Sequence, residues 1–291
     1  MATGDITVSS FQASLPFILD SARVVRPYAA VMPKLVERHT LPEGTGVSWD
    51  EVSLAQLTAQ NVNENTIMDN PQEIVDTLFS VTPIMAGIHT VMTRRSQRRV
   101  SKMVTAKIGV LGQQAMETKK DKDLLLILDT ATTSLGGAGT TFAAGIIAAA
   151  RARIRGNSTE AAEGEIFAVL HPYQIKDVQD DLVAGVGTYV VDAGITEETF
   201  RRGFQGAVFG VNVFEDPNIT VDSSDDAKGG VFAREALVLV QGASPVAYTK
   251  FIENRGGGAD AMWMYDEYAI GERSAGNWLF EVYTDAATPS N

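Results

Sequence analysis

The sequence contains no cysteine and only three histidines, His39, His89 and His171, among its 291 residues. The absence of cysteine excludes disulfide bonds, thiolate metal sites and a cysteine nucleophile. None of the histidines has the spacing of a metal-binding motif such as His-Glu-x-x-His. His171 stands directly before Pro172, where it is better interpreted as a residue that begins a helix. We therefore expect no metal and no cofactor.

Long hydrophobic runs and basic charge are also scarce. No apolar stretch reaches the roughly 18 residues that a membrane span needs. The longest run of small apolar residues, 143–150, is followed at once by Arg151, Arg153 and Arg155. Residues 1–10 lack the basic start and apolar centre of a signal peptide. The net charge of -12 and the pI of about 4.7 argue against a general nucleic-acid-binding surface. No membrane partner is expected.

Motifs of common enzymes are missing as well. The chain has neither a Gly-x-Ser-x-Gly element nor the Gly-Lys pair of a phosphate-binding loop. The glycine-rich segment 136–141 could hold an anion at a helix start, but it lacks a full Gly-x-Gly-x-x-Gly pattern and is typical of a turn. The acidic segment 222–226 lacks the alternating carboxylates of a calcium loop and predicts a solvated loop. These absences argue against an enzyme.

The first 45 residues carry scattered aromatic residues and prolines. Phe11 and Phe17 lie among prolines at positions 16, 27, 33 and 42, which would interrupt any long helix. Short helices are possible at 15–24 and 28–36. Two interpretations stay open: an arm that gains its order from neighbouring chains, or a loosely packed first layer of the same domain.

Residues 46–95 have the pattern of an extended excursion. A strand begins near 46–49, polar residues follow, and apolar side chains then alternate with polar ones at 75–81 and again at 88–92. Alternation with β-branched residues indicates strands, which Pro83 and Gly87 interrupt. Because an isolated two-stranded hairpin is marginally stable in water, we expect this excursion to lie on another chain.

A basic cluster, Arg94, Arg95, Arg98, Arg99 and Lys102, opens a long helix. Its apolar stripe is predicted at residues spaced three and four apart: Val100, Val104, Ile108, Leu111 and Ala115. The helix would run from about 98 to 130, and the polar segment 119–123 allows a break. At about 1.5 Å per residue it would be ~45 Å long, the length of a beam across a whole molecule.

The remaining chain mixes short helices and strands without a regular β-α-β alternation. Helices are expected at 141–155 and from Pro172 onward, and strands at 165–170, 231–241, 248–253, 263–268 and 278–283, with a glycine-punctuated hairpin at 203–214. The fold class is therefore α+β. The aromatic residues of the last strands are assigned to the core in preference to an interface: Trp263, Tyr265, Tyr268, Trp278, Phe280 and Tyr283.

This order of elements resembles the major capsid proteins of tailed bacteriophages, which have the HK97-type fold. The most specific stretches are EIFAVLHPYQIKDVQDDL at 165–182, FQGAVFGVNVFEDPNI at 204–219 and MWMYDEYAIGERSAGNWLFEVYTD at 262–285. The first has the family's step from a strand through His-Pro into a helix, and the second has its glycine-rich hairpin. The resemblance covers nearly the whole chain through the order of its motifs.

The resemblance implies a division of the chain. It gives an N-terminal arm at 1–45, an extended loop at 46–95, the spine helix of the peripheral domain at 96–135, an axial domain at 138–245, and strands that return to the peripheral domain at 246–291. Some family members cross-link a lysine of the extended loop to an asparagine. Residues 46–93 contain no lysine, so that chemistry is not expected here.

The function implied is that of a self-assembling shell protein that forms homo-pentamers and homo-hexamers around phage double-stranded DNA, made in the host cytoplasm and kept in the virion. Its acidity would prevent it from adhering to that DNA. A separate scaffolding protein is an implied partner, because only a short arm precedes the loop. A portal is implied as well, and a decoration protein is left open. An encapsulin-like shell of a cellular compartment and an unrecognised enzyme remain alternatives.

Candidates for contacts between subunits follow from the same reasoning. The arginine cluster could meet acidic surface on a neighbour, although a solvated helix start would give the same pattern. Because a positive cluster at a helix N-terminus opposes the helix dipole, a negative group should lie near it. The full set of candidates is Arg94, Arg95, Arg98, Arg99, Phe79, Ile84, Met85, Phe11 and Phe17.

Overall fold

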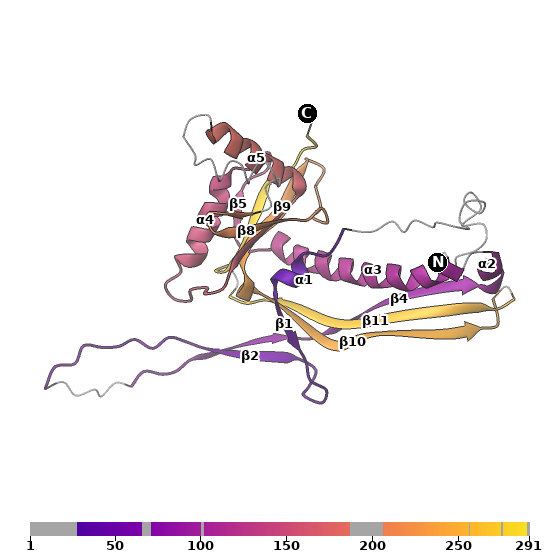
Figure 1. Ribbon diagram of the computed structural model, residues 1–291. Coiled ribbons are helices and arrows are strands. Elements are labelled where there is room, and N and C mark those ends of the chain that lie inside the picture. Colours follow the sequence, from indigo (N-terminus) through magenta and orange to yellow (C-terminus); the bar gives the residue numbers. More distant parts are fainter. Residues whose placement is uncertain are drawn as a thin grey trace.

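A computed structural model describes residues 28–65, 71–99, 102–186, 206–255, 257–274 and 276–289. It has a compact lobe, an elongated lobe and a thin ribbon that projects from the elongated lobe (Figure 1). The elements in chain order are α1 Met32–Leu35, β1 Glu37–Thr40, β2 Trp49–Leu54, β3 Asp76–Val81, β4 Ile84–Thr93, α2 Arg94–Arg99, α3 Lys102–Asp129, β5 Ser134–Gly136, α4 Ala144–Arg155, β6 Ile166–Leu170, α5 Pro172–Val186, β7 Ala207–Val208, β8 Val211–Glu215, β9 Asp226–Ala233, a 3-10 turn Arg234–Ala236, β10 Leu237–Ile252, β11 Ala259–Glu272 and β12 Leu279–Asp285.

The elongated lobe consists of a four-stranded sheet with α3 beside it. The strand order is β1-β10-β11-β4, with β1 parallel to β10 and the other pairs antiparallel. Gly112 of α3 lies against Met264 of β11, so closely that a Cβ at this position would overlap the methionine sulfur. Lys120 of α3 forms a largely buried ion pair with Asp266 of β11, at 2.7 Å. These contacts hold the helix along the sheet.

The compact lobe contains the six-stranded sheet β5-β12-β9-β6-β8-β7 together with α4 and α5. All five residues of β6 are buried, as expected for a strand covered on both faces. Helix α4 buries Ala144, Ile147, Ala150 and Ile154, a spacing of three and four that forms a single apolar face. Leu124 and Leu128 near the end of α3 are fully buried in the same core. The long helix therefore connects the two lobes.

The long helix differs from its prediction in three ways. The four arginines of the basic cluster lie in α2, Lys102 is the first residue of α3, and α3 continues without a break through residues 119–123. Lys119 pairs with Asp123 one turn later at 2.9 Å, which supports that polar segment as helix. Leu111 and Ala115 are exposed, whereas Gly112 and Met116 are buried. The buried face lies one residue further along than predicted, because the helix packs on β11 through its glycine.

Strand β4 corrects the predicted excursion at 46–95. Its residues pair with β11 from Ile84 to Thr93, so this strand belongs to the four-stranded sheet and only β2 and β3 form the ribbon. Gly87 does not interrupt β4. A Cβ at Gly87 would lie 3.1 Å from the ring of Tyr265, so the glycine gives that ring room on the neighbouring strand.

Three further strands differ from expectation. The segment 248–253 is the end of one 16-residue strand, β10. Strand β12 pairs with β9 and β5 in the compact lobe, so the last strand does not return to the peripheral sheet with β11. The expected solvated loop is confirmed at 222–225, whose residues are exposed and precede the strand. Strand β9 begins at Asp226, earlier than the strand expected from 231, and the buried Asp226 carboxylate accepts a hydrogen bond from the Gly139 amide at 2.7 Å.

The core assignment of the late aromatic residues is confirmed for Tyr268, Trp278 and Phe280, which are buried. Trp263 is half-buried and stacks on His89 across the sheet, with ring centroids 4.8 Å apart. The predicted helix at 15–24 lies outside the described residues, as does most of the predicted arm.

Candidate interaction surfaces

The β2–β3 ribbon exposes apolar side chains. Its strands pair only with each other among the described residues, from Trp49 opposite Val81 to Leu54 opposite Asp76. Val52, Leu54 and Leu78 are 56%, 67% and 64% exposed. Further exposed aliphatic residues follow in the chain beyond the strands: Leu57, Val62, Ile74 and Val75. A contiguous set of this kind marks a surface that contacts another molecule.

The ribbon is also acidic throughout. Residues 46–93 contain six acidic residues and neither lysine nor arginine: Asp50, Glu51, Glu64, Asp69, Glu73 and Asp76. Glu73 and Asp76 are exposed, whereas the Asp50 carboxylate accepts a hydrogen bond from the Ser80 hydroxyl at 2.5 Å. A partner for this surface must therefore offer both apolar contact and positive charge.

The base of the ribbon is attached to the elongated lobe by apolar packing. Trp49, Phe79 and Val81 pack on a small cluster formed by Val238, Val240 and Ala269. The rings of Trp49 and Phe79 meet edge to face, with centroids 6.3 Å apart. Phe79, one of the residues expected at a contact between subunits, is partly buried in this base, and its contact with another subunit stays a prediction.

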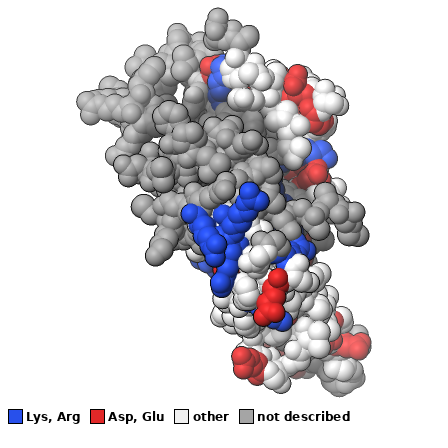
Figure 2. Space-filling view, turned by 90° about the vertical axis from the view of Figure 1, so that its right-hand side faces the viewer, with Lys and Arg blue, Asp and Glu red and all other residues white. Residues whose placement is uncertain are grey.

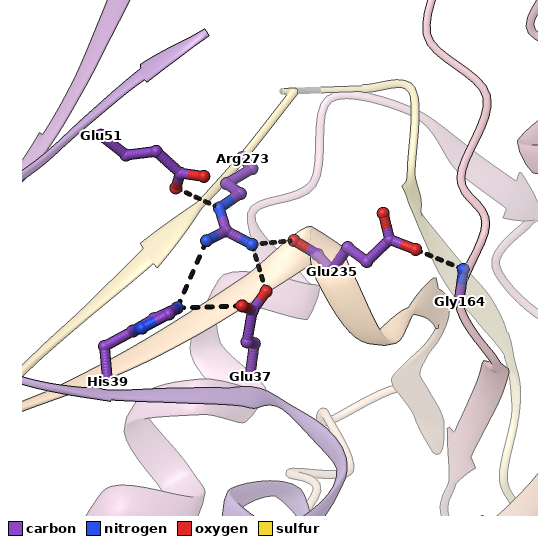
Figure 3. Close-up of polar contacts among 6 residues, drawn as sticks. All are labelled: Glu37, His39, Glu51, Gly164, Glu235 and Arg273. Atoms are coloured by element: carbon purple, nitrogen blue, oxygen red, sulfur yellow. Dashed lines mark hydrogen bonds and ion pairs between the residues drawn. The ribbon is translucent and has the colours of Figure 1, made fainter.

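A polar cluster lies next to that packing and is drawn in Figure 3. Arg273, just beyond β11, donates from Nε to Glu51 at 2.6 Å and from Nη1 to Glu37. Burial raises the pKa of the Glu37 carboxyl, but the hydrogen bond and charge of Arg273 outweigh that effect and hold the pKa below its ordinary value. The cluster therefore joins β1, β2 and the end of β11 through ionised groups.

A basic tip lies at the opposite end of the elongated lobe from the ribbon (Figure 1). Arg94, Arg95 and Arg98 of α2 are exposed, and the view onto this end shows blue side chains grouped together (Figure 2). The guanidinium of Arg94 lies 4.3 Å from the ring centroid of Phe251. Within α2, Gln97 donates to the Asp260 carboxylate at 2.7 Å, so a negative group does lie near this helix. We define the basic tip as Arg94, Arg95 and Arg98.

The remaining predicted contact residues fall into two groups. Ile84 and Met85, at the start of β4, are 75% and 64% exposed and remain available for a contact. The side chain of Arg99 and the residues Phe11 and Phe17 lie outside what the structure describes. The sequence analysis missed the aliphatic residues of the ribbon, although the alternation of Val52 and Leu54 was a usable signal. It also missed Arg273, which no local pattern marks.

Three other features of the described residues bear on possible sites: metal-binding groups, membrane-spanning helices and the buried histidine His171. They contain no group of three or more histidine, aspartate or glutamate side chains placed to hold a metal ion. No described helix combines the length and apolar character needed to cross a membrane. The imidazole of His171 is buried at the start of α5, and burial lowers its pKa.

Comparison with known proteins gives a result at the level of fold. No family model and no curated protein sequence matches the chain. Among solved structures, a chain of Mycobacterium phage Che8 superposes with a TM-score of 0.69 at 16% identity, covering 91% of this chain and 95% of that one. The capsid of Ralstonia phage GP4 gives 0.69 at 14% identity over 93% and 95%. The capsid of cyanophage Pam1 gives 0.73 at 11% identity over 99% and 100%.

These superpositions define the fold. The chain has the α+β fold of phage capsid proteins over nearly its full length, which confirms the fold that the order of motifs implied. At identities of 11–16%, the likeness between this chain and these structures is one of fold, and most aligned positions hold different residues.

Proposed function

We propose that this chain is the major capsid protein of a tailed bacteriophage, which forms the pentamers and hexamers of an icosahedral head enclosing double-stranded DNA. The observation that carries the proposal is coverage: nearly all of this chain aligns with nearly all of each phage capsid chain. The net charge of -12 suits a shell that must not adhere to the DNA inside it.

The parts of the molecule take their roles from this proposal. The β2–β3 ribbon is the extended loop, α3 is the spine of the peripheral domain, and the compact lobe is the axial domain around fivefold and quasi-sixfold axes. Residues 1–45 are the arm. A scaffolding protein and a portal are its proposed partners, and a decoration protein on the outer surface is an optional third.

The ribbon and the basic tip supply one contact between subunits. They lie at opposite ends of one molecule, so each subunit can offer its ribbon to the next and its tip to the previous one (Figure 1). A head-to-tail contact of this kind closes into a ring when the rotation between subunits allows it. The acidic ribbon meets arginines, and charge complementarity of this type selects register and partner more than it adds affinity.

A charge exchange tests this contact. The variant Arg95→Glu with Arg98→Glu should keep the melting temperature of the free subunit and lose closed shells in electron micrographs. Adding Glu73→Arg and Asp76→Arg in the same chain should restore shells, because both sides of the contact are then reversed. Failure of the fourfold variant to recover, with the ribbon variant alone assembling normally, would refute this pairing.

A further inference from the structure

Arg273 is built into the body of the molecule. Its main-chain amide donates to the Ala236 carbonyl at 2.8 Å, and its Nη1 donates to the Glu235 carbonyl at 3.3 Å. Its side chain is only 14% exposed. Because main chain and side chain are both held by the segment that precedes β10, the guanidinium has a fixed place relative to the elongated lobe.

From that fixed place the guanidinium reaches two strands that are separate in the sheet pattern (Figure 3). Nε binds Glu51 of β2, and Nη1 binds Glu37 of β1. His39 of β1 lies 3.0 Å from the Glu37 carboxylate and stacks on Trp49 of β2, with centroids 4.6 Å apart. The planar, forked guanidinium holds both carboxylates in defined directions, which a lysine ammonium could not do.

Other contacts also attach the ribbon to the body. Strands β2 and β3 share no backbone ladder with either large sheet in the described chain. Trp49, Phe79 and Val81 pack on the elongated lobe, and the Gln56 amide donates to the Thr159 carbonyl. Among these contacts, the bond between Arg273 and Glu51 is the one between two charged side chains, and it lies at the base of the ribbon.

We infer that Arg273 is a positioning residue that sets the direction in which the ribbon leaves the body, through its bonds to Glu51 and Glu37. A small change in the angle between the ribbon and the body displaces the far end of the ribbon by a large distance. At about 3.3 Å per residue, the roughly 14 residues from Glu51 to the far turn reach ~45 Å, so a tilt of about 10° moves the far end by ~8 Å. A displacement of that size would carry the ribbon off a complementary surface. The consequence for assembly rests on the proposed function, whereas the positioning itself does not.

The absence of cysteine allows a direct measurement on the free subunit. Val62→Cys on the ribbon and Ala149→Cys on α4 are exposed sites for a pair of spin labels, and pulsed electron paramagnetic resonance reports the distribution of distances between them. With Arg273 present, we expect one narrow peak. In Arg273→Gln a broad distribution of distances should replace that peak. The width of the distribution in Arg273→Lys should lie between those of the parent and Arg273→Gln. Arg234→Gln, an exposed arginine of the adjacent 3-10 turn, is the matched control and should keep the narrow peak.

The outcomes separate this inference from the proposed function. An unchanged narrow peak in Arg273→Gln would overturn the inference, whatever the variant assembles into. A broad peak in a variant that still closes normal shells would leave the inference standing and remove the role given to the ribbon. If Arg273→Gln does not fold, Glu51→Ala takes its place, because it removes the same bond from the ribbon side. A narrow peak in Glu51→Ala would equally overturn the inference.

Discussion

Two buried carboxyl groups, Asp121 of α3 and Asp216 after β8, lie against each other where the chain before α1 meets the long helix. Asp121 accepts hydrogen bonds from the amides of Val31 and Met32, each at 2.9 Å, and from the Asn218 side chain at 2.9 Å. Burial, followed by the hydrogen bond with Asp121, raises the pKa of Asp216 to about 7. The Asp216 carboxyl is therefore only partly ionised near neutral pH.

This pair predicts a pH dependence of stability. A carboxyl whose pKa is higher in the folded than in the unfolded chain contributes stability at low pH, and that contribution is lost as pH rises from about 4 through 7. At about 1.4 kcal/mol per pKa unit, the loss between pH 4 and 8 amounts to at most ~4 kcal/mol. Urea unfolding at both pH values measures it.

Asp216→Asn is the control for that experiment, because an amide keeps a hydrogen-bond donor toward Asp121 and cannot ionise. We expect the free energy of unfolding of this variant to change much less between the two pH values. A decline equal to that of the unaltered chain would show that other groups cause it. Tyr28 and Glu215 are the next titratable groups at this junction, joined by a hydrogen bond of 3.3 Å.

At the scale of elements, α3 contains two glycines that differ in their surroundings. A Cβ at Gly109 would meet no described atom within 4 Å, whereas a Cβ at Gly112 would overlap the sulfur of Met264. Gly109→Ala should raise the free energy of unfolding by about 0.5–1 kcal/mol, because alanine restricts the unfolded chain. Gly112→Ala should be ~1 kcal/mol less stable than Gly109→Ala, because the Met264 side chain must leave its place between α3 and β11. Equal values from chemical denaturation would contradict the close packing described here.

The ribbon gives a second prediction at this scale. All described residues from 57 to 75 are exposed, so replacing 57–73 by Asn-Gly should leave a shortened hairpin and an intact fold. The melting temperature should stay within a few degrees of the parent, while closed shells disappear from micrographs. Normal particles from this variant would remove the ribbon from the assembly mechanism.

The sequence predicts some elements of the fold well and others poorly. Residue spacing located the helices and most strands, because period and chain breakers are local properties: 165–170 and 172 onward match β6 and α5 closely. Pairing is not local. No local pattern in residues 84–93 indicates that they pair with β11 and not with the ribbon. Arg273 is likewise 222 positions away from Glu51 in the sequence. The exposed arginines of α2 were found by composition, whereas the anchor of the ribbon was not.

At the scale of the whole molecule, the surfaces proposed for contacts between subunits lie at the two ends of the elongated lobe (Figure 1). The core is continuous from the compact lobe into the end of α3, so the two lobes form one body. The acidic, apolar ribbon and the basic tip extend from the elongated lobe in opposite directions (Figure 1). Extensions of this kind let one chain bury more surface on its neighbours than a single compact patch of about 800 Å² per partner would allow.

Electron cryomicroscopy of the full chain, expressed alone and together with its flanking genes, tests the central claim most directly. The account predicts closed icosahedral shells in which the ribbon of each subunit lies against the α2 arginines of the next. A chain that stays monomeric under both conditions, or shells in which each ribbon folds back along its own sheet, would contradict it.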